Sequence, residues 1–265
     1  MEFKEKESYC FDDLVAIMKL LRSPEGCPWD KEQTHSSIRQ NFIEETYEAV
    51  EAIDTQDTAL LKEELGDVLL QVVFHAEMES EKGSFSIDDV CDGICKKLIV
   101  RHPHIFSDVQ ANTSETVLKN WDAIKMKTKS QSTQGEVMQG ISKALPSLMR
   151  STKIQQKASK AGFDWDDAQG AFEKVEEELS ELRSAYKQGD HDACEEELGD
   201  LLFSAVNVSR FVGADAERAL YRACDKFISR FTAVERLAKE SGLDMKKATL
   251  AQLDSLWEKV KECQK

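Results

Sequence analysis

The sequence is poor in the residues that interrupt helices. Only four prolines and twelve glycines occur among 265 residues, and long stretches rich in Glu, Lys, Leu and Ala lie between them. This composition indicates an all-α protein. The hydrophobic fraction of 41% is sufficient for packed cores.

The sequence also has no excess of positive charge and no long apolar run. Its net charge is −15 and its pI is about 4.9, which argues against a protein that binds duplex nucleic acid, because such a protein needs a basic face. No run of 18 apolar residues occurs, and residues 1–21 lack the apolar core of a signal peptide. We therefore expect neither nucleic-acid nor membrane partners. Phosphate ligands remain compatible with this charge, because a bound divalent metal reverses the local field.

The seven cysteines do not form a recognisable metal or redox motif. They are scattered, and no C-x-x-C occurs. Cys91 and Cys95 are four residues apart on an expected helix, but a zinc site would require a second pair. Reduced thiols are typical of the cytoplasm, so we expect a cytoplasmic protein.

An acidic helical hairpin is expected over residues 174–208. Glu178 and Glu181 are three residues apart, as are Glu197 and Asp200, so each pair lies on one helix face. Residues 188–191, with the sequence Gln-Gly-Asp-His, have the composition of a turn. Positions 178 and 200 are equidistant from residue 189, and so are positions 181 and 197. An antiparallel hairpin that turns there holds the two pairs at matching heights.

Four carboxylates that face one another repel, unless some are protonated or a cation lies among them. The hairpin therefore predicts a metal site. The same spacing occurs 133 residues earlier around residues 54–57, in the set Glu45, Glu48, Glu64 and Asp67. A single Glu-rich hairpin is often only a solvated face, but the repeat favours two metal sites and two domains of about 130 residues each.

The expected domains are residues 1–128 and 141–265, joined by a linker at 129–140. The region from 128 to 135 is rich in Ser, Thr, Gln and Lys, which is typical of a linker. Outside the acidic hairpins, apolar periodicity and capping residues predict helices at 11–21, 86–100, 114–127, 147–161, 215–240 and 250–261. Proline-containing segments at 23–30 and 101–104 are expected to be loops.

A second repeated pattern follows each acidic set. Lysine and arginine are four residues apart on one helix face, and further on tryptophan and lysine are four residues apart. The members are Lys97, Arg101, Trp121 and Lys125 in the first half, and Lys226, Arg230, Trp257 and Lys261 in the second. Cations bind phosphate groups and tryptophan stacks on a nucleobase. Beside a site for Mg²⁺, these residues suit a metal–polyphosphate–base ligand.

The acidic pattern resembles that of a known family. Written as E-E-x-x-E followed by E-x-x-D, it begins at Glu44 and again at Glu177. This arrangement is similar to the all-α nucleoside triphosphate pyrophosphohydrolases. The tandem architecture and the segments 26–30, 101–104 and 162–165 resemble the MazG family, and the resemblance covers nearly the whole chain.

The resemblance implies hydrolysis of nucleoside triphosphates, both NTP and dNTP, to a monophosphate and pyrophosphate. It implies dependence on Mg²⁺, with Mn²⁺ as a substitute, and a homodimer whose hairpins pair into four-helix bundles. It also implies a house-cleaning role against non-standard nucleotides. The C-terminal domain is then the main catalytic one, although the N-terminal set is intact and forms a second metal and substrate site.

Residue roles follow from the resemblance position by position. The expected Mg²⁺ ligands are Glu178, Glu181, Glu197 and Asp200. Lys226 and Arg230 bind the phosphates and stabilise the leaving pyrophosphate, while Trp257 and Lys261 complete the nucleotide site. Either Glu177 or Glu178 receives the proton of the attacking water. Some relatives carry a lysine four residues before the third carboxylate; this chain has Ala193 there, so no phosphate contact is expected from that position.

Three other functions compete with this interpretation. A di-iron bundle would use two E-x-x-H motifs, and only Glu32-x-x-His35 occurs. A non-enzymatic acidic scaffold would not require cations and tryptophan to recur in register. A narrower dUTP- or phosphoribosyl-ATP-type pyrophosphohydrolase remains open.

Overall fold

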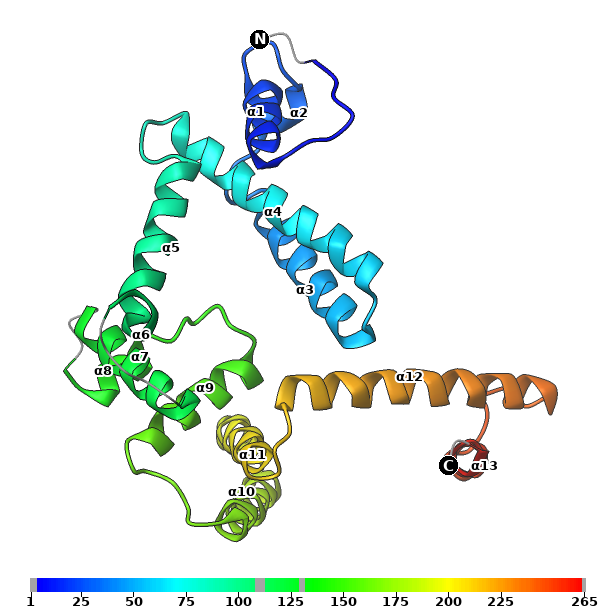
Figure 1. The fold of residues 1–265 in the computed structure, drawn as a ribbon. Coiled ribbons are helices and arrows are strands. Elements are labelled where there is room, and N and C mark those ends of the chain that lie inside the picture. The colour runs from blue at the N-terminus through cyan, green and yellow to red at the C-terminus, as the bar shows by residue number, and fades with distance from the viewer. Residues whose placement is uncertain (1–3, 108–112, 129–131, 264–265) are drawn as a thin grey trace. The chain divides into compact units, whose positions relative to one another are not determined.

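The computed structural model describes residues 4–107, 113–128 and 132–263. These residues form thirteen helices and no strand (Figure 1). The all-α class expected from the composition is therefore confirmed. The chain divides into two compact units, residues 1–125 and 126–265.

The first unit is centred on a long helical hairpin. Its helices are α1 (Phe11–Arg22), α2 (Pro28–Glu32), α3 (Arg39–Thr55), α4 (Thr58–Ser80), α5 (Ile87–Arg101), α6 (Pro103–Phe106) and α7 (Ser114–Thr128), of which α7 continues past the boundary of the unit. Helices α3 and α4 pack along their length as the antiparallel hairpin, and α1 packs against α4 (Figure 1).

The core of the first unit lies where α1 meets the C-terminal half of α4. Met18, Ile38, Val73, Phe74 and Met78 are buried together there. They come from α1, from the residue that precedes α3, and from α4, so the apolar faces of α1 and α4 meet at one cluster. This core fixes the end of the hairpin that is away from the turn, and the acidic residues lie between the core and the turn.

The second unit repeats the hairpin. Its helices are α8 (Gln134–Gln139), α9 (Ser147–Lys160), α10 (Ala168–Gln188), α11 (His191–Phe211), α12 (Ala216–Glu240) and α13 (Leu250–Cys263). Helices α10 and α11 form the antiparallel hairpin, with α9 packed against α11. Helix α12 packs against α9 and α13.

The turns of the two hairpins use the same backbone device. Gly189 has a φ of 71° and Gln56 has a φ of 58°, so both place a left-handed residue after the first helix. Asp57 and Asp190 follow, and each caps the second helix by accepting hydrogen bonds from backbone N–H groups. The turn predicted at residue 189 from the spacing of the carboxylates is confirmed.

Three expected irregular segments contain short helices instead. Helices α2 and α6 begin within the expected loops at 23–30 and 101–104 and extend two residues past them. They begin at Pro28 and Pro103, because proline at the first helical position loses no hydrogen bond. Helix α8 lies within the expected linker, where Thr133 and Glu136 form a capping box. Within the described part of the chain, no helix is long and apolar enough to cross a membrane.

Candidate metal and nucleotide site

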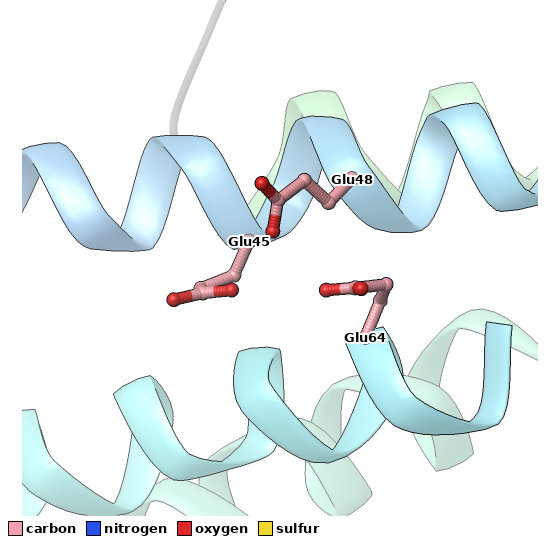
Figure 2. A group of neighbouring side chains, drawn as sticks. All are labelled: Glu45, Glu48 and Glu64. Atoms are coloured by element: carbon pink, nitrogen blue, oxygen red, sulfur yellow. The ribbon is translucent and has the colours of Figure 1, made fainter. Parts of the chain in front are cut away.

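The N-terminal hairpin brings three carboxylates together. Glu45 and Glu48 extend from α3 and Glu64 from α4, and Figure 2 shows their side chains converging between the two helices. One carboxylate oxygen from each lies within 4.8 Å of the other two. Glu64 is buried, Glu45 is half-buried and Glu48 is exposed. The group therefore has a desolvated side and an open side.

The C-terminal hairpin repeats this arrangement with a different choice of three. Glu178 extends from α10, and Glu197 and Asp200 extend from α11, again with oxygens within 4.8 Å of one another. Glu178 is only 4% exposed, although it is charged and lies near the surface of a two-helix hairpin. Its burial means that its charge must be compensated by a neighbour.

The fourth carboxylate of each predicted set lies beside these groups rather than within them. Asp67 is close enough that its charge raises the pKa of Glu45 and Glu64. Burial raises the pKa of Glu197, and the charge of Glu181 adds to the effect. Each hairpin therefore holds three convergent carboxylates and an adjacent fourth.

Burial and mutual repulsion both raise the pKa values of carboxyls in these groups. Burial raises the pKa of Glu45, and the charges of Asp67 and Glu48 add to the effect. Burial also raises the pKa of Glu64, with contributions from Glu48 and Asp67. Clustered carboxylates with raised pKa values are the donor set that a hard divalent cation such as Mg²⁺ or Mn²⁺ would take, because the cation removes the repulsion. The residues of both groups thus fit such an ion.

One lysine distinguishes the two groups. The ammonium of Lys174 lies 2.6 Å from Glu178 and 3.0 Å from Glu177. These hydrogen bonds, first to Glu178 and then to Glu177, raise the pKa of Lys174. The residue at the same distance before Glu45 is Asn41. Sequence reasoning missed Lys174, although its position one helical turn before a predicted ligand was a usable signal.

The two candidate catalytic acids differ in their surroundings. Glu178 is buried within the carboxylate group, whereas Glu177 is exposed and directed at Lys174. Ala193 lies in the first turn of α11, where Asp190 accepts a hydrogen bond from its backbone N–H. It therefore serves the cap of that helix.

The predicted phosphate and base residues of the second unit lie on α12 and α13. Lys226 is exposed and Arg230 is half-buried on α12. Trp257 on α13 lies against Phe227, with ring centroids 5.2 Å apart. The ammonium of Lys261 lies 2.7 Å from Glu258. Cations and aromatic rings thus share one pair of helices.

Their counterparts in the first unit lie on α5 and α7. Lys97 is exposed on α5, and the guanidinium of Arg101 lies over the ring of Trp121, 5.2 Å from its centroid. His102 meets the same ring edge-on at 4.9 Å. Lys125 is half-buried on α7. The tryptophan is therefore in contact with an arginine here and with a phenylalanine in the second unit.

Comparisons with known proteins place the chain in a family. The model of the MazG nucleotide pyrophosphohydrolase domain matches twice, at residues 33–106 and 167–234. These ranges contain both carboxylate groups and both Lys–Arg pairs, and they end before Trp121 and Trp257. The chain belongs to the MazG nucleotide pyrophosphohydrolase family.

Relatives align over nearly the whole chain. The nucleoside triphosphate pyrophosphohydrolase/pyrophosphatase MazG of Thermotoga maritima is 47% identical over 251 residues, which is 95% of each chain. The nucleoside triphosphate pyrophosphohydrolase of Escherichia coli K12 is 44% identical over 94% of this chain and 96% of its own. A Bacillus subtilis protein, YabN, is 44% identical over 96% of this chain and 52% of its own length. The family and the enzyme class expected from the acidic repeat are confirmed.

Proposed function

We propose that this chain hydrolyses nucleoside triphosphates to nucleoside monophosphates and pyrophosphate, with Mg²⁺ as cofactor and the C-terminal unit as the main site. The observation that carries the proposal is the convergence of Glu178, Glu197 and Asp200 in a hairpin that the chain builds twice. Two relatives that align over nearly their full length are named for this activity.

The carboxylates would hold the cofactor, and Glu181 lies close enough to assist them. Mg²⁺ bound there would neutralise triphosphate charge and make a water molecule a stronger nucleophile, and Mn²⁺ would substitute for it. Lys226 and Arg230, one turn apart on α12, would bind phosphate oxygens and stabilise the charge that develops on the leaving pyrophosphate. Trp257 and Lys261 would hold the nucleoside end.

Glu177 and Glu178 are the two residues proposed to accept the proton of the attacking water. Glu178 shares the carboxylate group, so its replacement should weaken cation binding as well as turnover. Glu177 lies outside that group. Glu177→Gln should therefore separate the roles: loss of turnover with unchanged Mn²⁺ binding, followed by electron paramagnetic resonance, assigns the base to Glu177.

A homodimer is proposed because the hairpins expose large apolar side chains. Leu198 and Leu202 lie one turn apart on α11 and are 47% and 53% exposed; Leu65 and Leu69 repeat this on α4. Apolar stripes of this kind are covered when a second hairpin packs on them as a four-helix bundle. Light scattering should give twice the chain mass of 30.0 kDa.

The second copy would also complete the site. Among the described residues, neither α12 nor α13 packs substantially against the α10–α11 hairpin, so one chain does not itself bring Arg230 to Glu178. Mixed dimers of Glu178→Ala and Arg230→Ala, each also carrying Glu45→Ala, should regain activity that neither variant has alone. Mixed dimers that stay inactive would contradict a shared site.

House-cleaning of non-standard nucleotides is the proposed biological role. Aromatic stacking at Trp257 tolerates many bases, which supports a broad substrate range. Competition between standard and deaminated or oxidised nucleoside triphosphates tests this role. Activity confined to dUTP or phosphoribosyl-ATP would replace it with a narrower one.

A further inference from the structure

The aromatic surroundings of Trp121 and Trp257 differ between the two units. On α12, Phe227 follows Lys226 and Phe231 follows Arg230. Phe227 lies 5.2 Å from Trp257 with the rings tilted by 44°, and it stacks on Phe231 at 6.1 Å and 16°. Three rings therefore form one cluster beside the two cations that are expected to bind phosphate.

This cluster is open to solvent. Phe227 is 56% exposed and Phe231 is 41% exposed, and Trp257 is half-buried. Large aromatic rings that remain exposed next to a phosphate-binding pair supply a stacking platform for a base. We call Phe227, Phe231 and Trp257 the aromatic platform.

The first unit has the tryptophan without the platform. The positions that match Phe227 and Phe231, counted from the lysine of the Lys–Arg pair, are Leu98 and His102. His102 contacts Trp121 edge-on, and one of its ring nitrogens is 2.7 Å from the carbonyl oxygen of Leu98. The imidazole is therefore fixed against the tryptophan by its own helix.

Arg101 occupies a face of the same tryptophan ring. Its guanidinium lies 5.2 Å from the ring centroid, a cation–π contact. A base that stacked on this face would have to displace that contact, which is worth about 0.5–2 kcal/mol. Arg101 is also the residue expected to bind phosphate, so the tryptophan and the phosphates compete for it.

We propose that the two units recognise nucleotides differently: the C-terminal site binds the base through the aromatic platform, and the N-terminal site, with Trp121 covered by Arg101 and His102, binds the triphosphate and metal alone. The proposal rests on the proposed function, because it assigns substrate recognition within those two sites. Contact with the base then belongs to the C-terminal unit, and the N-terminal unit binds a triphosphate whether or not it carries a base.

Equilibrium binding tests this without requiring turnover. The probes are the non-hydrolysable α,β-imido analogues of ATP and UTP, and inorganic tripolyphosphate as a ligand without a base, all with Mg²⁺. Full-length Glu45→Ala isolates the C-terminal site, and full-length Glu178→Ala isolates the N-terminal site. The C-terminal site should bind the ATP analogue at least tenfold more tightly than tripolyphosphate, whereas the N-terminal site should bind the two within about threefold, as expected if stacking is absent.

Reciprocal substitutions should remove base-dependent binding from the C-terminal site and create it in the N-terminal site. Phe227→Leu with Phe231→His, in the Glu45→Ala background, should weaken binding of the ATP analogue about tenfold and leave tripolyphosphate unchanged. Leu98→Phe with His102→Phe, in the Glu178→Ala background, should tighten binding of the ATP analogue alone. Tyr186→Leu, which removes a ring that is 78% exposed at the end of α10, is the matched control and should change neither.

The outcomes separate this inference from the proposed function. Equal effects on the ATP analogue and tripolyphosphate, or equal base dependence at both sites, would overturn the difference in recognition even if the enzyme releases pyrophosphate. Absence of pyrophosphate from any nucleotide would instead overturn the proposed function. If the variant that carries Phe227→Leu and Phe231→His fails to fold, the tighter binding of the ATP analogue expected from Leu98→Phe with His102→Phe still tests the difference in recognition.

Discussion

The ammonium group of Lys174 lies 2.6 Å from the buried carboxylate of Glu178, one turn further along α10. This lysine supplies the positive charge that the carboxylate needs when no cation is bound. Its replacement by a residue of similar size without charge should leave Glu178 uncompensated. The cost of such an unpaired buried group is about 1–3 kcal/mol.

Lys174→Met should therefore lower the melting temperature in the presence of a chelator, and Mg²⁺ should raise it by more than it does in the wild type. Differential scanning calorimetry with and without Mg²⁺ measures both effects. Asn41→Met, at the equivalent place in the first unit, is the matched control and should leave the response to Mg²⁺ unchanged. An equal Mg²⁺ response in Lys174→Met and wild type would show that the lysine does not compensate Glu178.

Gln56 and Gly189 should respond oppositely to substitution. Both have a positive φ at the hairpin turn, a conformation that costs a residue with a side chain roughly 1 kcal/mol relative to glycine. Gln56→Gly should stabilise the first unit, whereas Gly189→Ala should destabilise the second by a similar amount. Urea unfolding of each variant provides the measurement, and a destabilising Gln56→Gly would contradict the argument.

Gly26 permits a close approach of backbone in the first unit. A Cβ added there would lie 2.2 Å from the carbonyl oxygen of Leu21 and 2.3 Å from that of Leu20. Because backbone cannot yield as a side chain does, Gly26→Ala should shift the 23–30 segment and lower the melting temperature. Gly93→Ala on α5, where no atom lies within 4 Å of the added carbon, should instead be stabilising by about 0.5–1 kcal/mol.

The stability of the first unit should fall on mild acidification because of His75. Its Nδ1 is 2.7 Å from that of His35, and the rings are stacked at 5.0 Å, while His35 contacts Glu79 through its other nitrogen. Burial, and then the charge of His35, lowers the pKa of His75 below its usual 6.5. Between these two pKa values the unfolded chain binds a proton at His75 and the folded chain does not. The free energy of unfolding therefore falls as the pH decreases from about 6.5 through the lowered pKa.

Glu79 affects the stability of the first unit at lower pH than His75 does. Hydrogen bonds from Lys82 and His35 lower its pKa to about 2, so its contribution persists above its usual pKa and is lost between about 4.5 and 2. Melting temperature is measured from pH 7 to 5 in wild type and His75→Phe, because carboxyls with raised pKa values, such as Glu45 and Glu64, also affect stability as the pH falls and only the difference between the two proteins reports the histidine. His75→Phe should flatten this range, and an unchanged slope would exclude His75 as its cause.

Much of the hairpin geometry follows from residue spacing. Carboxylates equidistant from residue 189 predict the turn that the structure places there, because helical period and antiparallel pairing together determine which residues face one another. The short helices α2 and α6 do not follow from the sequence as easily, because Pro28 and Pro103 indicate loops although proline also begins helices.

Residue spacing does not predict which three of the four carboxylates converge in each hairpin. Glu48 joins the first group and its counterpart Glu181 does not join the second, although both have the same position in the repeat. Side-chain rotamers and neighbours such as Lys174 decide such differences, and they are set by packing rather than by sequence period. The contact of Arg101 with Trp121 likewise cannot be predicted from residue spacing, because it joins two separate helices.

Product analysis tests the central claim most directly. Nucleoside triphosphates would be incubated with Mg²⁺ and wild type, Glu45→Ala, Glu178→Ala or the double variant, and products resolved by phosphorus-31 NMR. We predict monophosphate and pyrophosphate from the wild type, most of that activity in Glu45→Ala, and a loss of about 100-fold or more in Glu178→Ala. Orthophosphate as the product, no cleavage of any nucleotide, or full activity in the double variant would contradict the account.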